Sequence, residues 1–227
     1  MIPQAVVIVT ATLTLRSDDK PIRITVNKPR GTVYWGGAGL DGIYLQDQVD
    51  ALQQAGIRHV WVGRRTMGAL PDAARSASDL RYKGRSDDQS WMIEGMEKVS
   101  APQFNLIGYS YGSLMAAQTA HVYGSNGHVV DHLVLIGSPI DADFLADLQG
   151  NPNIKRVIII NLQEHGDPIY AGISQWRLTA ASWKLKTQDE ESGNTMGVGH
   201  FYYRPASDEG KRRRRELAKL LVQQGVQ

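Results

Sequence analysis

The sequence predicts an α/β fold in which a mostly parallel central sheet is flanked by helices, with little or no cap domain. Short apolar runs alternate with helical segments along the 227 residues, as in chains that build parallel sheets. Several runs are almost continuously apolar, which is expected of strands covered by helices on both faces. Apolar residues make up 42% of the chain and charged residues 21%, so we expect one globular domain over residues 1–227.

The expected elements begin with a hairpin and then alternate between strand and helix. The expected strands are residues 5–15, 22–26, 32–35, 58–62, 104–107, 129–136, 157–161 and 180–186. The expected helices are residues 44–55 and 90–99, a segment directly after Ser110, and residues 211–222. One face of the first helix is expected to carry Leu45, Val49 and Leu52. One side of the last helix is expected to carry Leu217, Leu220 and Leu221.

Composition excludes several kinds of function. The chain has no cysteine, which excludes disulfides, thiolate catalysis and cysteine-based metal sites. No cluster of histidine and acidic residues has metal-ligand spacing, so we expect neither a metal nor another cofactor. The net charge of +2 is too small to indicate a nucleic-acid partner. Residues 2–15 favour a first strand, with a signal peptide as the alternative, and no stretch is long and apolar enough for a membrane span.

The most informative stretch runs from Asn105 to Ala117, N-L-I-G-Y-S-Y-G-S-L-M-A-A. It predicts a short apolar strand, a G-x-S-x-G turn and a helix rich in small residues. A serine at such a strained turn projects its Oγ beyond the sheet. Gly108 and Gly112 remove side chains that would collide where strand and helix approach closely. The stretch therefore predicts Ser110 as a nucleophile, and the alternative is an ordinary serine in a tight turn.

A serine nucleophile needs a histidine to take its proton and an acid to hold that histidine. Among the six histidines, His200 differs because it stands in the glycine-rich loop M-G-V-G-H-F near the C-terminal segment. Asp167 stands in a G-D-P turn after a late strand, where active sites of parallel sheets gather. The order Ser110, Asp167, His200 is the one expected for a nucleophile at such a turn. The competing acids are Asp141, Asp143 and Glu164.

The developing oxyanion needs two hydrogen-bond donors. One is expected to be the backbone N–H of Tyr111, directly after the nucleophile. The other is expected from the glycine-rich loop 36–39, with Gly37 as the first choice and Ala38 as the second. The alternative for this loop is a plain glycine turn.

Taken together, the G-Y-S-Y-G, G-D-P and G-V-G-H-F motifs resemble those of the α/β-hydrolase superfamily, on its lipase and esterase side. The resemblance covers the chain from about the third strand to the C-terminal helix. It implies a serine hydrolase that cleaves carboxylic esters through an acyl-enzyme without a cofactor. Many relatives have His-Gly at the oxyanion loop, where this chain has Trp35-Gly36. A compact, cap-poor hydrolase of this size also resembles some bacterial secreted lipase-type effectors.

Two features bear on the substrate. Only about 20 residues join the strands ending near 136 and starting near 156, so the site is expected to be open. Residues 64–88 and 170–195 are the candidate covers. The apolar residues just after Asp167 have three alternative roles: an acyl-binding wall, a lid, or an amphipathic core helix. These residues are Ile169, Tyr170, Ile173 and Trp176.

The strongest charge feature is the basic run Lys211, Arg212, Arg213, Arg214 and Arg215. It predicts either contact with an anionic membrane surface or a solvated basic face. An open site, apolar neighbours and this run favour a lipid ester as substrate, hence a lipase or phospholipase.

Other hypotheses about the function stay open at this point. A thioesterase or an amidase would use the same three side chains, and a non-catalytic hydrolase fold would bind a ligand or partner instead. We expect a soluble chain, either cytoplasmic or delivered as an effector.

Overall fold

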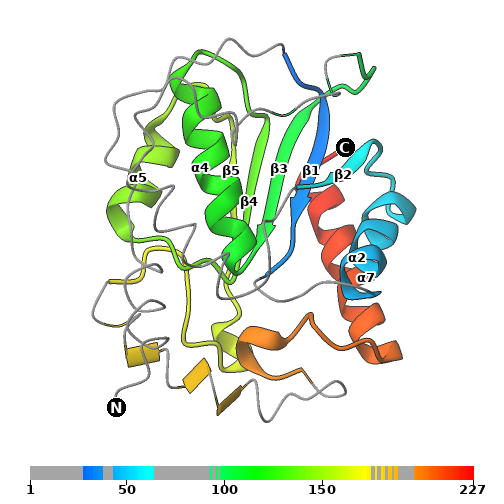
Figure 1. The fold of residues 1–227 in the computed structure, drawn as a ribbon, viewed down its shortest axis with the longest axis vertical. Helices are drawn as coiled ribbons and strands as arrows, with labels where there is room; N and C mark the ends of the chain where they lie inside the picture. Colours follow the sequence, from blue (N-terminus) through cyan, green and yellow to red (C-terminus); the bar gives the residue numbers. More distant parts are fainter. Residues whose placement is uncertain are drawn as a thin grey trace, which may run out of the picture.

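A computed structural model of the chain describes residues 28–37, 43–63, 93, 96, 98–174, 177, 180, 181, 184, 185, 187, 188 and 197–227. Over these residues, one five-stranded sheet has the order β2-β1-β3-β4-β5, and every neighbouring pair is parallel (Figure 1). The strands are β1 (Gly31–Trp35), β2 (Val60–Val62), β3 (Phe104–Tyr109), β4 (His132–Ile136) and β5 (Val157–Ile160). The predicted fold class is confirmed, while the expected hairpin at 5–15 and 22–26 lies outside the described residues.

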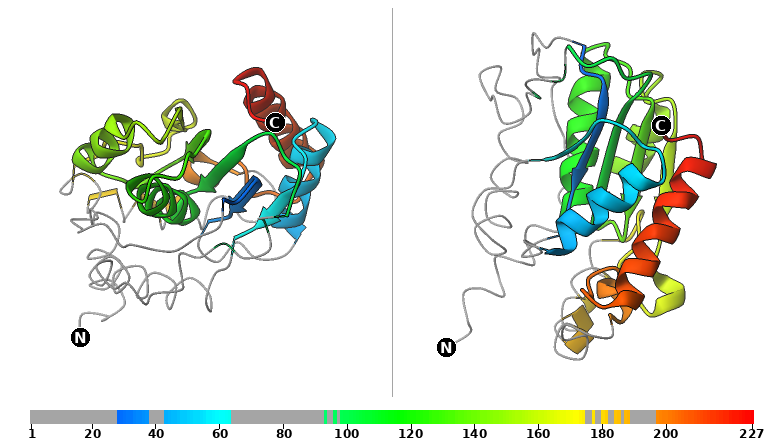
Figure 2. Two further views of the ribbon diagram at one scale, coloured as in Figure 1. Left: turned by 90° about the horizontal axis from the view of Figure 1, so that it is seen from above. Right: turned by 90° about the vertical axis from the view of Figure 1, so that its right-hand side faces the viewer.

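In the described part of the chain, four helices with complete bounds flank the sheet, two on each face (Figures 1 and 2). Helices α4 (Tyr111–Ser125) and α5 (Ala142–Gly150) lie on one face. Helices α2 (Ile43–Gln54) and α7 (Asp208–Gln223) pack against each other on the opposite face. Successive strand residues point to opposite faces, so each strand contributes to two separate cores.

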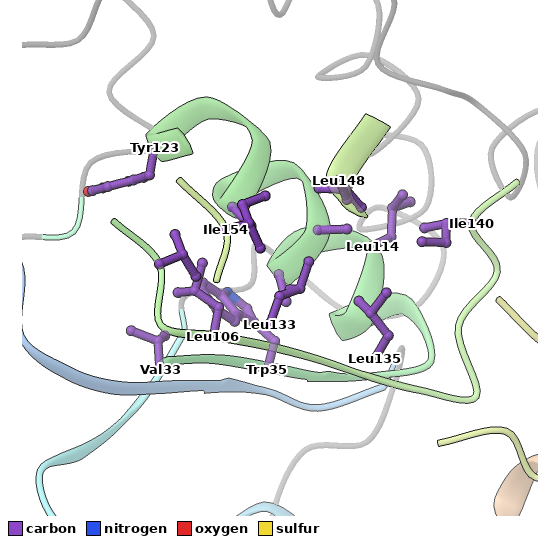
Figure 3. Close-up of a cluster of buried hydrophobic side chains, with 14 of the residues drawn as sticks. Val33, Trp35, Leu106, Leu114, Tyr123, Leu133, Leu135, Ile140, Leu148 and Ile154 are labelled. Atoms are coloured by element: carbon purple, nitrogen blue, oxygen red, sulfur yellow. The ribbon is translucent and has the colours of Figure 1, made fainter. Parts of the chain in front are cut away.

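The two cores follow this alternation. Val33 and Trp35 of β1 pack with Leu114 and Leu148 beneath α4 and α5 (Figure 3). Tyr34, between them in the sequence, points to the other face instead. There the α2 and α7 side chains Leu52, Leu217 and Leu221 cover it together with neighbouring strand residues. The near-continuous apolar runs of the strands are therefore explained by burial on both faces.

Three sequence predictions are wrong in detail. Within the expected strand 180–186, the described residues are helical, because Ala181 and Leu185 stand four apart and share one helix face. Within the expected helix 90–99, the described Ile93 and Met96 are not helical. Leu220 is 40% exposed, since the buried side of α7 follows Leu217 and Leu221 instead.

The basic run of α7 is not one uniform surface. The helix begins at Asp208, with Ser207 as its N-cap and two acidic residues in its first turn, so the arginines do not oppose the positive end of the dipole. Arg214 is fully buried and donates to the carbonyls of Tyr203 and Pro205 at 2.6 and 2.8 Å. It also lies 3.0 Å from the carboxylate of Asp47 on α2.

Other members of the run also have partners. Arg212 is bound by the carboxylates of Glu209 and Glu216. Arg214 therefore cannot reach a membrane, and the charge of Arg212 is offset by its neighbours. The predicted contact with an anionic surface stays a prediction, and it would rest on Lys211 and Arg215. Among the described residues, no helix has the length and apolar character needed to cross a bilayer.

A buried polar network ties the amino ends of the strands to the C-terminus. Nδ1 of His132 lies 2.9 Å from Oδ1 of Asn105, whose amide nitrogen donates to Thr32 Oγ1 and to the carbonyl of Gln227. An amide oxygen only accepts, so Nδ1 of His132 carries the proton. Burial lowers the pKa of His132 below its ordinary value of 6.5.

This network predicts a loss of stability in mild acid. Because the pKa of His132 is lower folded than unfolded, its contribution is complete above pH 6.5 and is lost as the pH falls below that value. The measurement is urea unfolding at about pH 7.5 and about pH 5.5 for the wild type and His132→Gln. The wild type should lose more unfolding free energy between the two pH values than the variant. An equal loss in both proteins would contradict the assignment.

Candidate active site

The turn between β3 and α4 holds Ser110 in a strained backbone conformation. Its φ of 55° and ψ of −124° lie in a region that residues with side chains rarely adopt. Two backbone hydrogen bonds hold this conformation. Ser110 N donates to the carbonyl of Ile136 at 2.8 Å, and Ser113 N donates to the carbonyl of Ser110 at 2.9 Å. The serine thus sits at a sharp corner at the carboxyl end of the central strand.

Glycines on both sides of Ser110 allow this corner. A Cβ at Gly108 would lie under 3.0 Å from backbone atoms of Gly112 and Ser113. A Cβ at Gly112 would lie equally close to the carbonyl oxygens of Trp35 and Gly36. The start of α4 is therefore in direct backbone contact with β3 and with the loop after β1, as the two glycines predict.

Ser110, His200 and Asp167 form one hydrogen-bonded row. Ser110 Oγ lies 2.6 Å from His200 Nε2, and His200 Nδ1 lies 2.8 Å from Asp167 Oδ2. The ionised carboxylate accepts, which puts the ring proton on Nδ1 and leaves Nε2 free to accept from the serine hydroxyl. Asp167 Oδ1 accepts a further bond from Ile169 N at 2.8 Å, which fixes the carboxylate. The structure thus brings together the three side chains that the sequence selected.

The histidine and the acid are removed from solvent. The Asp167 side chain is 0% exposed and that of His200 is 5% exposed. Asp167 follows β5 and a short 3-10 turn (Gln163–His165), and His200 lies in a second one (Gly199–Phe201). In such a dry site, a hydrogen bond to a charged group is stronger than in water.

The competing acids have other surroundings. Asp141 is the N-cap of α5 and accepts from Phe144 N at 2.7 Å. Asp143 lies in the first turn of the same helix. The Glu164 side chain is 79% exposed and lies 3.4 Å from His165. Among the acids considered, Asp167 is the one bonded to His200.

The expected oxyanion donors lie on the two segments that meet at Ser110. Tyr111 is the first residue of α4, and Gly37 is buried in the loop after β1, next to Gly36, whose carbonyl faces Gly112. Their role as donors stays a prediction. The second choice, Ala38, lies outside the described residues.

The apolar residues after Asp167 are covered by protein. Ile169 and Ile173 are buried and pack with Ala181, with Tyr170 against them, in a small separate cluster. This burial argues against an acyl-binding wall for these residues. The expected core helix is wrong over 169–173, because this segment forms turns and irregular structure instead. Trp176 and the candidate cover 64–88 lie outside the described residues, as does much of 170–195.

Gln188 joins the two loops that carry the acid and the histidine, and no sequence pattern predicted this role. Its amide nitrogen donates to the carbonyl of Gly166 at 2.8 Å, and its amide oxygen accepts from His200 N at 3.1 Å. Gly199 has a φ of 54°, and a Cβ there would meet the Gln188 amide. The glycine before His200 thus makes room for this bridge.

Tyr109 contacts both the backbone and the ring of His200. Its hydroxyl donates to the carbonyl of His200, and the two rings stack with centroids 5.8 Å apart. Burial, followed by the charge of Asp167, raises the pKa of Tyr109 well above its ordinary value of 10.0. The hydroxyl therefore stays protonated and able to donate. The sequence signal that could have indicated a role for Tyr109 was its position next to Ser110 in the G-x-S-x-G turn.

In the part of the chain that the structure describes, no group of three or more histidine and acidic residues could hold a metal ion. A hydroxyl aligned on an oriented imidazole is an activated nucleophile for an acyl carbon.

Comparisons with known proteins agree with the fold. A family model described as alpha/beta hydrolase fold matches residues 73–177, a range that includes Ser110 and Asp167 and ends before His200. Searches of curated proteins and of solved structures found no match.

The close approach of β3 and α4 at the G-x-S-x-G turn predicts that a larger residue at Gly108 would destabilise the protein. Gly108→Ala should lower the free energy of unfolding by about 2–3 kcal/mol, because its Cβ would press on the backbone of α4. Gly150→Ala is the matched control, since nothing lies within 4 Å of a Cβ there. The control should change that free energy by less than about 1 kcal/mol. Equal unfolding free energies for the two variants would argue against the close approach.

Proposed function

We propose that this chain, which belongs to the α/β-hydrolase superfamily, is a serine hydrolase that cleaves carboxylic esters, with lipid or other acyl compounds as substrates. The observation that carries the proposal is the row from Ser110 through His200 to Asp167, with distances of 2.6 and 2.8 Å. The strained backbone of Ser110 supports it, because such strain gathers at functional sites.

In the first half-reaction, Ser110 Oγ attacks the ester carbonyl carbon while His200 Nε2 takes the hydroxyl proton. The buried carboxylate of Asp167 stabilises the imidazolium that forms and keeps its ring in position. When the tetrahedral intermediate collapses, the C–O bond to the alcohol breaks. His200 then gives its proton to the leaving alcohol, and an acyl-enzyme remains on Ser110.

In the second half-reaction, His200 takes a proton from a water molecule that attacks the acyl carbon. Collapse of this second intermediate returns the proton to Ser110 and releases the carboxylic acid. In both intermediates the oxyanion would accept from the backbone N–H groups of Tyr111 and Gly37. The contact between Gly36 and Gly112 supports this pair, because it holds the two segments side by side.

The connection after β4 supports an open site. Between β4 and β5 the chain forms α5 and its flanking loops, without an inserted cap domain. Hydrolysis of p-nitrophenyl esters from acetate to palmitate tests the substrate class. A preference for long acyl chains would favour a lipase or phospholipase. Turnover of thioesters or anilides in place of esters would favour a thioesterase or an amidase.

The nucleophile is tested by Ser110→Ala. We expect kcat on the best p-nitrophenyl ester to fall by at least about 10⁴-fold, because the acyl-enzyme cannot form. Ser125→Ala is the matched control, since Ser125 is exposed at the other end of α4. It should leave kcat unchanged. Full turnover by Ser110→Ala would refute the proposal, and so would an absence of turnover by the folded wild type on esters, thioesters and amides.

The acid is tested by Asp167→Asn, which keeps the size of the side chain and removes its charge. We expect kcat to fall by about 10⁴-fold, because an amide can favour the wrong tautomer of His200. Asp141→Asn is the control, because asparagine caps a helix as well as aspartate does. If Asp141→Asn were the impaired variant and Asp167→Asn were fully active, the acid would be wrongly assigned.

A further inference from the structure

Three side chains from three separate segments stack beside the Asp167–His200 pair. The rings of His165 and Tyr202 are parallel to within 3°, with centroids 3.6 Å apart. The guanidinium carbon of Arg213 lies 4.1 Å from the centroid of the Tyr202 ring. Because His165 occupies one face of that ring, the guanidinium covers the other. The stack thus joins the acid loop, the histidine loop and α7.

The stack lies close to the two residues that need alignment. His165 precedes Asp167 by two residues, and Tyr202 follows His200 by two. Both loops are short turns outside the sheet, so no ladder hydrogen bond sets their separation. In an enzyme, a displacement of about 1 Å between reacting groups can cost about 100-fold in rate. A rigid contact between the two loops therefore has a direct effect on the alignment of the pair.

Arg213 is itself firmly held. One guanidinium nitrogen donates to the carbonyls of Gly197 and Tyr202 at 3.1 and 3.0 Å. Its Nε donates to Glu209, one turn earlier on α7, at 3.0 Å. The side chain is 14% exposed. The arginine therefore connects α7 to both ends of the turn that contains His200.

The chemistry of this contact requires arginine. A planar guanidinium can lie flat on an aromatic ring and donate several hydrogen bonds at once, whereas a lysine ammonium is a single charge on a flexible chain. Arg215 stands two residues later in the same basic run and is exposed. The two arginines carry the same charge, so their different positions on α7 explain why Arg213 stacks on Tyr202 and Arg215 is exposed.

We propose that Tyr202 and Arg213 are positioning residues that, through the stack on His165, hold the acid loop and the histidine loop so that His200 stays aligned with Asp167 and Ser110. This proposal rests on the proposed function for its kinetic consequence. Its structural consequence, the alignment of His200 on Asp167, does not depend on turnover.

The test compares Tyr202→Leu with Tyr202→Phe, and Arg213→Gln with Arg215→Gln. On a p-nitrophenyl ester, Tyr202→Leu and Arg213→Gln should lower kcat by about 10- to 100-fold with KM within about twofold. Tyr202→Phe keeps the ring and should recover most of the wild-type kcat. Arg215→Gln should match the wild type. Circular dichroism confirms that each variant is folded.

A second readout separates this proposal from the proposed function. The proton on His200 Nδ1 should give a downfield NMR signal that Asp167→Asn removes. The signal should broaden in Tyr202→Leu and Arg213→Gln and stay sharp in Tyr202→Phe and Arg215→Gln. A sharp signal in folded Tyr202→Leu and Arg213→Gln would overturn the proposal, and so would equal kcat losses for Tyr202→Phe and Tyr202→Leu. An inactive wild type with the expected signal pattern would refute only the proposed function.

Discussion

The close approach of α4 to the carboxyl end of β3 is the constraint on which the site depends. It leaves no room for side chains at Gly108 and Gly112, and it holds Ser110 at a positive φ. A conformation of this kind costs about 1–3 kcal/mol and persists only where its surroundings hold it. Here the surroundings are the carbonyl of Ile136 on one side and the loop after β1 on the other. Because β3 is the central strand, the loops after β1 and β4 both border the serine.

A second constraint follows from burying a carboxylate and an imidazole together. Removing Asp167 from water is costly unless its oxygens are bonded, and both accept bonds, from His200 and from Ile169 N. His200 is then supported from several directions, by Gln188 at its backbone nitrogen and by Tyr109 at its carbonyl. The loops that carry this pair have little regular structure, so side chains from elsewhere in the chain provide their rigidity.

The sequence predicted the parts of the site that depend on local structure. The turn around Ser110 is a contiguous motif, and Gly108 follows from its close approach to Gly112 and Ser113 within that motif. Gly112 makes room for the carbonyls of Trp35 and Gly36 in addition, a contact between distant segments. Asp167 and His200 were predicted from their turns and their order along the chain. Gln188 could not be predicted in this way, because its partners lie 12 and 22 residues away and a single glutamine has no pattern. The periodicity of α2 was sufficient to place that helix within a residue or two of its ends.

The errors also have physical causes. The segment 180–186 is short and apolar, and a short run of this kind fits a strand or a buried helix equally well. Arg214 was grouped with its basic neighbours because charge patterns assume exposure, whereas its guanidinium is buried against backbone carbonyls and a carboxylate. Leu220 was assigned to the buried face of α7 by its helical spacing from Leu217, yet it is exposed. In all three cases, tertiary contacts decided between alternatives that local sequence left equal.

If Ser110 is an activated nucleophile, it should react with a fluorophosphonate probe, and mass spectrometry of the treated protein shows where the probe is bound. A fluorophosphonate reports on the nucleophile without requiring knowledge of the natural substrate. We expect one phosphonyl group per chain, located on the peptide that contains Ser110, and loss of labelling when the protein is unfolded in urea beforehand. A folded protein that stays unlabelled, or one labelled at a different serine, would contradict it.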